Sequence, residues 1–160
     1  MQLVDRMIRA AKLDVNLYEE VEHDVALTTE AATVVVISNV LFGLGTAMIH
    51  FSLKGLVMGV IGSVVGWAVF AGLVFIIGTK LLDGKADWGE MLRVLGYASA
   101  PLCLGIIPVV GTIVGSIWAL VAAVIAIRQG LDTTTGKAVV AAILSALAYI
   151  GIFTVLSWLL

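Results

Sequence analysis

Four long stretches of this 160-residue chain contain no Asp, Glu, Lys or Arg: residues 31–53, 55–79, 94–127 and 138–160. A helix crosses a hydrocarbon core of roughly 30 Å with about 20 apolar residues. Hydrophobic residues make up 61% of the chain and charged residues 12%, whereas soluble domains contain about 45–50% and about 25%. These figures exclude a water-soluble globule and predict an all-α, polytopic helical membrane protein.

The third run, residues 94–127, is too long for a single crossing. It contains Pro101 and Pro108, and Gly111 follows shortly after, so we expect two short helices joined by a turn at residues 108–111. This count gives five transmembrane segments, of which the third and fourth form a short hairpin broken by proline and glycine. The alternative is a re-entrant hairpin, which membranes tolerate only where the irregular backbone is buried in protein.

The basic residues predict the orientation. With the N-terminus inside, eight Lys and Arg residues fall on inner segments and Lys54 alone lies outside. This bias places the N-terminus in the cytoplasm and the C-terminus outside. We expect Trp88 and Trp158 to act as anchors at the membrane interface.

Half of the 20 charged residues lie in the first 30 positions. We therefore divide the chain into a cytoplasmic arm, 1–30, and a transmembrane domain, 31–160. The arm is predicted to form two short helices, the second capped by Asn16. Either the first helix lies on the membrane surface and the second is solvated, or the acidic arm docks a partner.

The segment after residue 86 has the pattern of an amphipathic helix. Asp87 and Glu90 have the spacing of a capping box, and apolar residues follow at helical spacing. We expect an interfacial helix here, with Trp88 at the headgroup level.

Six glycines are predicted to pack helices together, because small residues allow close approach where lipid provides no hydrophobic drive. Intramolecular packing and self-association are the two interpretations. The six are Gly55, Gly59, Gly62, Gly66, Gly111 and Gly115.

Few residues could support catalysis. His23 and His50 fall on opposite sides of the predicted membrane, and the single cysteine, Cys103, is expected to be a buried, inert small side chain. We expect no enzyme, no metal site and no cofactor. Charged groups are absent from the spans, which argues against ion-coupled transport. Asn39 is the most notable polar residue in the first span, and a broken helix near Pro101 could still form a small site for a neutral solute or a lipid.

The segment Leu92-Arg93-Val94-Leu95-Gly96-Tyr97-Ala98-Ser99-Ala100-Pro101, followed by the turn at 106–111, resembles the signature of the Yip1-domain family. The motif positions are Leu92, Arg93, Gly96, Tyr97, Pro101, Pro108 and Gly111. The resemblance implies a five-span protein with a cytosolic N-terminus and no catalytic residues. Eukaryotic members have long N-terminal regions and bind small GTPases. The arm here is short and resembles that of compact prokaryotic members, which implies an integral protein of a prokaryotic cytoplasmic membrane.

These observations predict a non-enzymatic adaptor or organiser that acts through protein contacts in the membrane and at its cytoplasmic face. The first alternative is an accessory subunit of a larger membrane complex, and the second is a small-solute or lipid transporter. The expected partners are the lipid bilayer and other integral membrane proteins or a cytoplasmic protein, not nucleic acid. A homo-oligomer is a further possibility.

Overall fold

The computed structural model describes residues 2–47 and 52–159, and every regular element in that part of the chain is helical. Two short helices, α1 (Gln2–Ala11) and α2 (Val15–His23), precede the bundle. A single turn, η1 (Val25–Leu27), leads into α3 (Thr28–Ala47). The remaining elements are α4 (Leu53–Leu81), α5 (Trp88–Ala98), the 3-10 helix η2 (Ala100–Ile106), α6 (Val110–Gly130) and α7 (Thr135–Leu159).

Four of these helical stretches are long and apolar enough to cross a membrane. They are Val25–Thr46, Leu53–Leu81, Val110–Gly130 and Thr135–Leu159. The chain is therefore a polytopic helical membrane protein. The 94–127 run contains the predicted break, because η2 ends at Ile106 and α6 begins at Val110. Within the turn, the Val110 amide donates to the Pro108 carbonyl at 2.7 Å.

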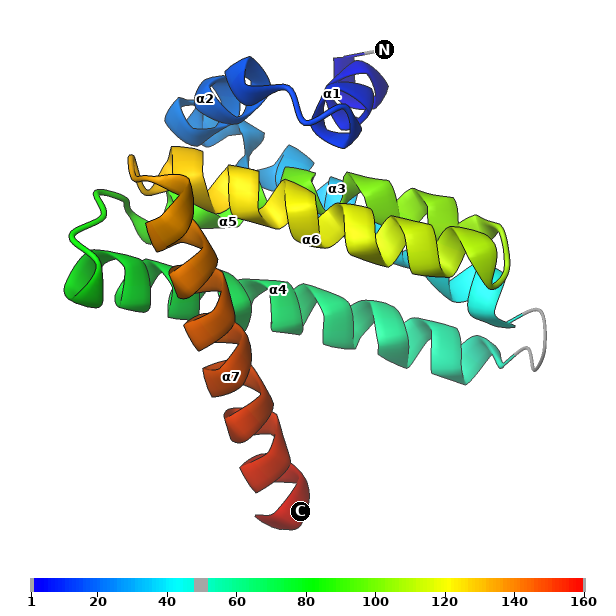
Figure 1. Cartoon of the computed structure of the whole chain (residues 1–160). Helices are drawn as coiled ribbons and strands as arrows, with labels where there is room; N and C mark the ends of the chain where they lie inside the picture. The colour runs from blue at the N-terminus through cyan, green and yellow to red at the C-terminus, as the bar shows by residue number, and fades with distance from the viewer. Residues whose placement is uncertain (1, 48–51, 160) are drawn as a thin grey trace.

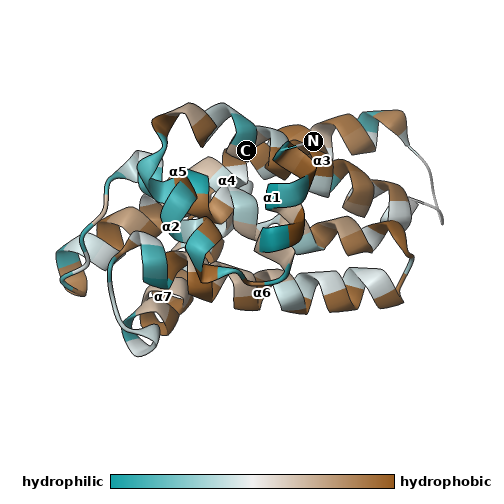
Figure 2. Cartoon of the chain, turned by 90° about the horizontal axis from the view of Figure 1, so that it is seen from above, coloured by the Kyte–Doolittle hydropathy of each residue, from teal (hydrophilic) through white to brown (hydrophobic). Residues whose placement is uncertain are grey.

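Figure 1 shows α3, α4, the α5–η2 segment and α6 side by side in a bundle, with α1 and α2 across one side of it. The last helix, α7, begins at the end of the bundle where α6 finishes and diverges from the other helices. Its side chains are mostly exposed, and Trp158 near its end is 86% exposed. Viewed from above, polar residues gather on α1, α2 and the loops at that same end (Figure 2).

Helix α5 begins as expected but is not interfacial. Asp87 Oδ1 accepts from the Glu90 amide at 2.8 Å, and Glu90 Oε2 accepts from the Asp87 amide at 2.6 Å, which completes the capping box. However, Met91, Val94 and most of the residues that follow are buried among other helices. The prediction of a surface helix was wrong, because α2, α3, α4 and α6 all pack against α5. Trp88 remains 52% exposed.

The arm also differs from the expectation. Its two helices are present, but Asp14 caps the second one by accepting from the Asn16 amide at 3.0 Å, so the Asn16 assignment was wrong. Arg9 helps to hold Asp14 at the capping position, because Arg9 Nε lies 2.8 Å from Asp14 Oδ2. The second helix is not solvated either. Leu17, Tyr18 and Val21 are fully buried against the bundle.

The glycines of α4 do not act as one packing stripe. A methyl group added at Gly59 or Gly62 would meet nothing within 4 Å, so intramolecular packing was a wrong expectation there. At Gly55 it would meet only Ser52 of its own first turn, whereas at Gly66 it would lie 2.5 Å from the Tyr149 hydroxyl of α7. Helical spacing places glycines on one face, but it does not determine whether a neighbouring helix covers that face.

The glycines of α6 lie against η2. A Cβ at Gly115 would come within 2.8 Å of the Pro101 carbonyl oxygen, and one at Gly111 would collide with the Leu104 carbonyl oxygen. Backbone atoms cannot move aside as flexible side chains do. The close approach of η2 and α6 therefore requires glycine at both positions.

Gly111→Ala should destabilise the protein by about 1–3 kcal/mol, a typical range for overpacking. Gly59→Ala is the matched control, and it should leave stability unchanged or raise it slightly, because alanine has the higher helix propensity. Thermal melts in detergent measure both. Equal melting temperatures for the two variants would contradict the packing described here.

Candidate functional site

The most constrained polar region joins the arm to the bundle. It centres on Arg93 of α5, whose residue surface is only 3% exposed. Arg93 Nε donates to the Val21 carbonyl at 2.8 Å, and Nη2 donates to the Glu22 carbonyl. Nη1 also donates to Thr28 Oγ1 at 3.4 Å, at the first residue of α3. One guanidinium group thus holds three elements together.

The acceptors of Arg93 explain how a buried cation is tolerated. Val21 and Glu22 belong to the last turn of α2, where carbonyl groups lack partners within the helix. The macrodipole also makes a helix C-terminus favourable for positive charge. Arg93 therefore neutralises and caps the end of α2, although no carboxylate lies within ion-pair distance among the described residues.

A second set of contacts lies one helical turn further along α5. Tyr97 donates its hydroxyl to Glu30 Oε1 at 2.6 Å, and Arg6 Nη1 lies 3.1 Å from the same oxygen. Gly96 lies against α3, since a Cβ there would stand 2.8 Å from the Ala31 side chain. The α1 cation, the α3 carboxylate and the α5 phenol thus form one chain of contacts.

The arm itself is held by a charge network. Arg6 and Arg9 both contact Glu20, at 3.1 and 2.8 Å, and Arg9 also pairs with Asp14. The hydrogen bond from Arg9 lowers the pKa of Asp14 and the pKa of Glu20. These groups are partly exposed, so each pair contributes modestly and the network acts mainly to orient α1 on α2.

Glu22 is an acidic side chain that this arrangement leaves unsatisfied. The residue is 6% exposed, and its Oε2 atom has no hydrogen-bond partner. Oε1 lies 3.3 Å from His23 Nδ1. Burial raises the pKa of the Glu22 carboxyl to about 7; the charge of His23 opposes this shift, and the carboxylates of Glu19, Asp132 and Glu90 reinforce it. The α2 surface, the start of α5 and the α6–α7 loop therefore bring carboxylates together.

The loops at this end of the bundle are joined to one another. The Lys85 amide donates to the Leu131 carbonyl at 2.9 Å, and Lys137 Nζ donates to the Leu82 carbonyl at 2.8 Å. Gln129 of α6 donates to the Glu19 carboxylate of α2. The arm, residues 82–87 and residues 131–134 thus form one connected surface, which we call the inner face.

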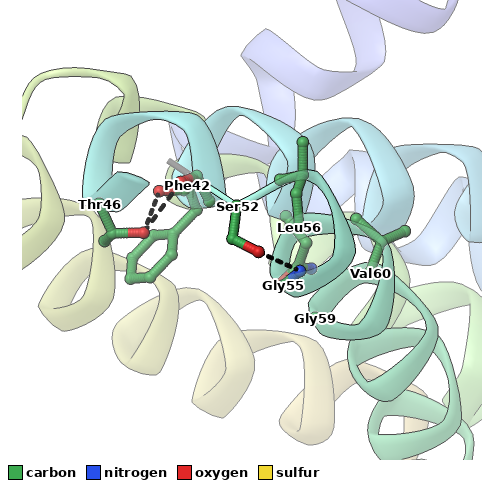
Figure 3. A pocket seen from close by; sticks show the side chains of 9 residues that line it. Phe42, Thr46, Ser52, Gly55, Leu56, Gly59 and Val60 are labelled. Carbon is green, nitrogen blue, oxygen red and sulfur yellow. Dashed lines mark hydrogen bonds between the residues drawn. The ribbon is translucent and has the colours of Figure 1, made fainter. Parts of the chain in front are cut away.

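The other polar residues of interest lie apart from this region. Asn39 donates to the Val35 carbonyl at 2.8 Å, within its own helix. Together with Thr46 and Ser52 it lines an open pocket of about 380 Å³ between α3 and α4 (Figure 3). The Thr46 hydroxyl bonds to its own helix, and Ser52 accepts from the Gly55 amide. These polar groups are satisfied locally, so the pocket contains no set of side chains aimed at a ligand.

The other residues considered for chemistry or metal binding do not belong to the region around Arg93. Cys103 is half-buried rather than buried, and its Sγ lies 3.4 Å from Ser38 Oγ. His50 lies outside the described residues. Within the described residues, no three His, Cys, Asp or Glu side chains gather in a way that could hold a metal ion.

Sequence reasoning named Arg93, Gly96 and Tyr97 but gave them no structural role. The structure brings these three together where the arm joins the bundle. Leu92 contributes its carbonyl, which accepts from Trp67 Nε1 of α4 at 3.0 Å. Pro101, Pro108 and Gly111 lie beyond, in η2, the turn and the first residues of α6. Glu22 and Glu30 were missed, and the only available signal was that they are acidic residues beside long apolar stretches.

The helices and the buried polar junction define an integral membrane protein that holds its N-terminal arm against its own bundle. The Yip1 domain family model matches residues 19–157, so the chain belongs to the Yip1 family. Comparison with curated proteins gave no significant match. Comparison with solved structures gave none either.

Tyr97→Phe should loosen the arm without unfolding the bundle. It removes one hydrogen bond to a charged group, which is typically worth about 1.5–3 kcal/mol. Limited proteolysis in detergent should then cleave between residues 11 and 15 faster than in the wild-type protein. Tyr149→Phe, in α7, is the control and should leave this cleavage unchanged. Equal cleavage in all three proteins would contradict the proposed role of Tyr97.

Glu22 should make arm docking depend on pH. Because its pKa is raised in the folded protein, its contribution to stability is fully present below the ordinary value of 4.5 and is lost as the pH rises through about 7. Hydrogen exchange of α2 amides, corrected for intrinsic rates, should therefore show weaker protection at pH 8 than at pH 5. Glu22→Gln should flatten this dependence, and Asp5→Asn, at an exposed position of α1 that does not contribute to the pKa shift of Glu22, should not. Parallel profiles for wild type and Glu22→Gln would refute the assignment.

Proposed function

We propose that this Yip1-family protein is a membrane adaptor: the helical bundle anchors it, and the inner face binds a cytoplasmic partner protein. The observation that carries the proposal is the attachment of the arm through Arg93. A surface that is already ordered loses less conformational entropy on binding than a free tail would. The arm and the two loops therefore offer a preformed docking surface.

The charges of the inner face indicate the kind of partner. Glu19 and Asp132 are exposed, and the side chain of Asp83 is 95% exposed. Carboxylates from three separate parts of the chain thus lie on this face, and they favour a partner with a basic segment. The proposed orientation places the N-terminus in the cytoplasm and the C-terminus outside. It is supported by the distribution of Lys and Arg, because eight of them lie on the segments predicted to be cytoplasmic and Lys54 alone lies on the other side.

An accessory-subunit role is the second candidate, and it has its own supporting observation. Gly59 and Gly62 present a surface of α4 with nothing within 4 Å. Such a strip allows another transmembrane helix to approach closely. In this case the partner would contact the spans rather than the inner face.

Charge reversal is a better test than deletion of the arm. Deletion would remove the carbonyl groups that satisfy Arg93 and would leave a buried cation unpaired, which is strongly destabilising. Glu19→Lys and Asp132→Lys change exposed positions instead, and Gly59→Leu changes the open strip of α4. Lys54→Glu, far from the inner face, is the matched control.

The experiment is purification from the native membrane in mild detergent, followed by quantitative mass spectrometry. We expect one protein to co-purify at fixed stoichiometry with the wild type and with Lys54→Glu, and to be reduced at least about tenfold by the double charge reversal, since interfacial charge pairs couple by more than about 1.4 kcal/mol. Loss only with Gly59→Leu would favour the subunit. A protein that purifies alone and moves solute in liposomes would overturn both and indicate a transporter.

A further inference from the structure

Helix α1 lies across α3, η2 and α6 (Figure 1) and borders an apolar groove, which we call the first groove. This groove has a volume of about 390 Å³, and its lining includes Ile8 of α1, Leu41 of α3 and Leu104 of η2. Every residue that lines it is apolar or aromatic apart from Cys103. Pockets for polar ligands carry a few well-placed polar groups. The first groove is therefore suited to a hydrocarbon chain rather than to a polar solute.

A second apolar groove shares Trp118 with the first. It has a volume of about 330 Å³, and its other lining residues belong to the α1–α2 turn and to α6: Leu13, Val114, Ile117 and Val121. Trp118 lines both grooves, and its Nε1 donates to the Ala11 carbonyl at 2.7 Å. This hydrogen bond holds the indole ring at the boundary between the two grooves. Two adjacent grooves that share one wall match the two acyl chains of a single phospholipid.

The first groove extends away from the polar level of the arm. Arg6 of α1 lies 3.1 Å from Glu30, in the first turn of α3. Leu41 is eleven residues beyond Glu30, which corresponds to about 16 Å along the helix axis. The last turn of α3 packs against η2, since a Cβ at Gly45 would collide with the Gly105 carbonyl oxygen. A chain in this groove would therefore begin near the charges of α1 and end among apolar residues, as an acyl chain does in a bilayer.

Two charged residues of α1 are available to a lipid headgroup. Asp5 and Lys12 are exposed, and neither forms an ion pair within the described part of the chain, whereas carboxylates engage both arginines of α1. Lys12 lies between Ala11, which lines the first groove, and Leu13, which lines the second. A phosphate that joins one chain in each groove would therefore lie within reach of Lys12.

Asp5 indicates the charge of the rest of the headgroup. It is seven residues from Lys12, so both residues lie on the same side of α1, two turns apart. A phosphate near Lys12 and an ammonium group near Asp5 would each meet the opposite charge, whereas an anionic headgroup would bring negative charge towards Asp5. We propose that α1 and α6 bind one zwitterionic phospholipid, with its acyl chains in the two grooves, its phosphate at Lys12 and its ammonium group towards Asp5.

This site gives the arm a second attachment to the bundle. Arg93 holds the end of α2, whereas α1 meets α6 through the hydrogen bond from Trp118 and borders grooves that the described residues leave unfilled. Two acyl chains would fill these grooves and connect α1 to α3, η2 and α6. The lipid site does not depend on the proposed adaptor role, because it uses neither the inner face nor a partner protein.

Native mass spectrometry tests the proposal. The delipidated protein, in detergent, is offered equal amounts of phosphatidylethanolamine, phosphatidylglycerol with identical chains, and single-chain lysophosphatidylethanolamine. We expect the wild type to retain one phosphatidylethanolamine, at least about fivefold more than either competitor, since one charged contact at a lipid surface corresponds to a factor of about five. Equal retention of the three lipids, or a preference for phosphatidylglycerol, would overturn the proposal.

Matched variants of α6 test the grooves. Val114→Trp fills the second groove and should abolish the preference for the two-chain lipid over the single-chain lipid. Ile113→Trp is the control, because this residue is 56% exposed on the same helix and lines neither groove. If Val114→Trp fails to fold, Val121→Trp, at an exposed position of the second groove, provides the same measurement. An unchanged preference in the groove variant would place the lipid elsewhere and overturn the site.

Variants of α1 test the headgroup contacts. Lys12→Gln should lower retention of phosphatidylethanolamine about fivefold, and Asp5→Asn should reduce the preference for it over phosphatidylglycerol. Lys85→Gln, at an exposed position of the inner face, is the matched control and should change neither quantity. Equal retention by Lys12→Gln and Lys85→Gln would show that Lys12 does not contact the phosphate and would contradict the proposed site.

Discussion

The buried guanidinium of Arg93 is the interaction on which the rest of the structure depends. Removing a cation from water is expensive, and one that loses its partners inside a protein destabilises the fold strongly. Here the partners are carbonyl groups at the C-terminus of α2 and the hydroxyl of Thr28. The bundle is complete only when the arm is docked, and the arm is therefore part of the folded domain.

The contacts between the apolar helices also depend on specific packing and polar groups. Apolar side chains gain little by leaving hydrocarbon for a helix interface, so close packing and polar contacts must hold the helices together. Gly105, Gly111 and Gly115 allow η2 to pack between α3 and α6. Tyr97 and Trp67 add hydrogen bonds at the end of the same hairpin that lies beside the arm. The family motif thus combines close packing at glycine and side-chain hydrogen bonds in one segment.

The sequence predicted the features that depend on local pattern. Charge-free runs located the long helices, the Asp87–Glu90 spacing predicted the start of α5, and Pro108 with Gly111 marked the turn. The features that depend on distant segments were not predictable. Arg93 and Val21 are 72 residues apart, and nothing in either local pattern indicates that α2 covers α5. The glycines of α4 likewise share a face, but the divergence of α7 leaves part of it open.

The most direct test of this account is the exchange of the Arg93 side-chain proton with water. With nitrogen-15 in the four arginines, NMR in lipid nanodiscs resolves each Nε–H group. We predict that the Nε–H of Arg93 exchanges at least about a hundredfold more slowly than that of Arg128, because opening the α2–α5 contact costs several kcal/mol. Equal exchange at the two sites would show that Arg93 is solvated and that the arm is not fastened to the bundle.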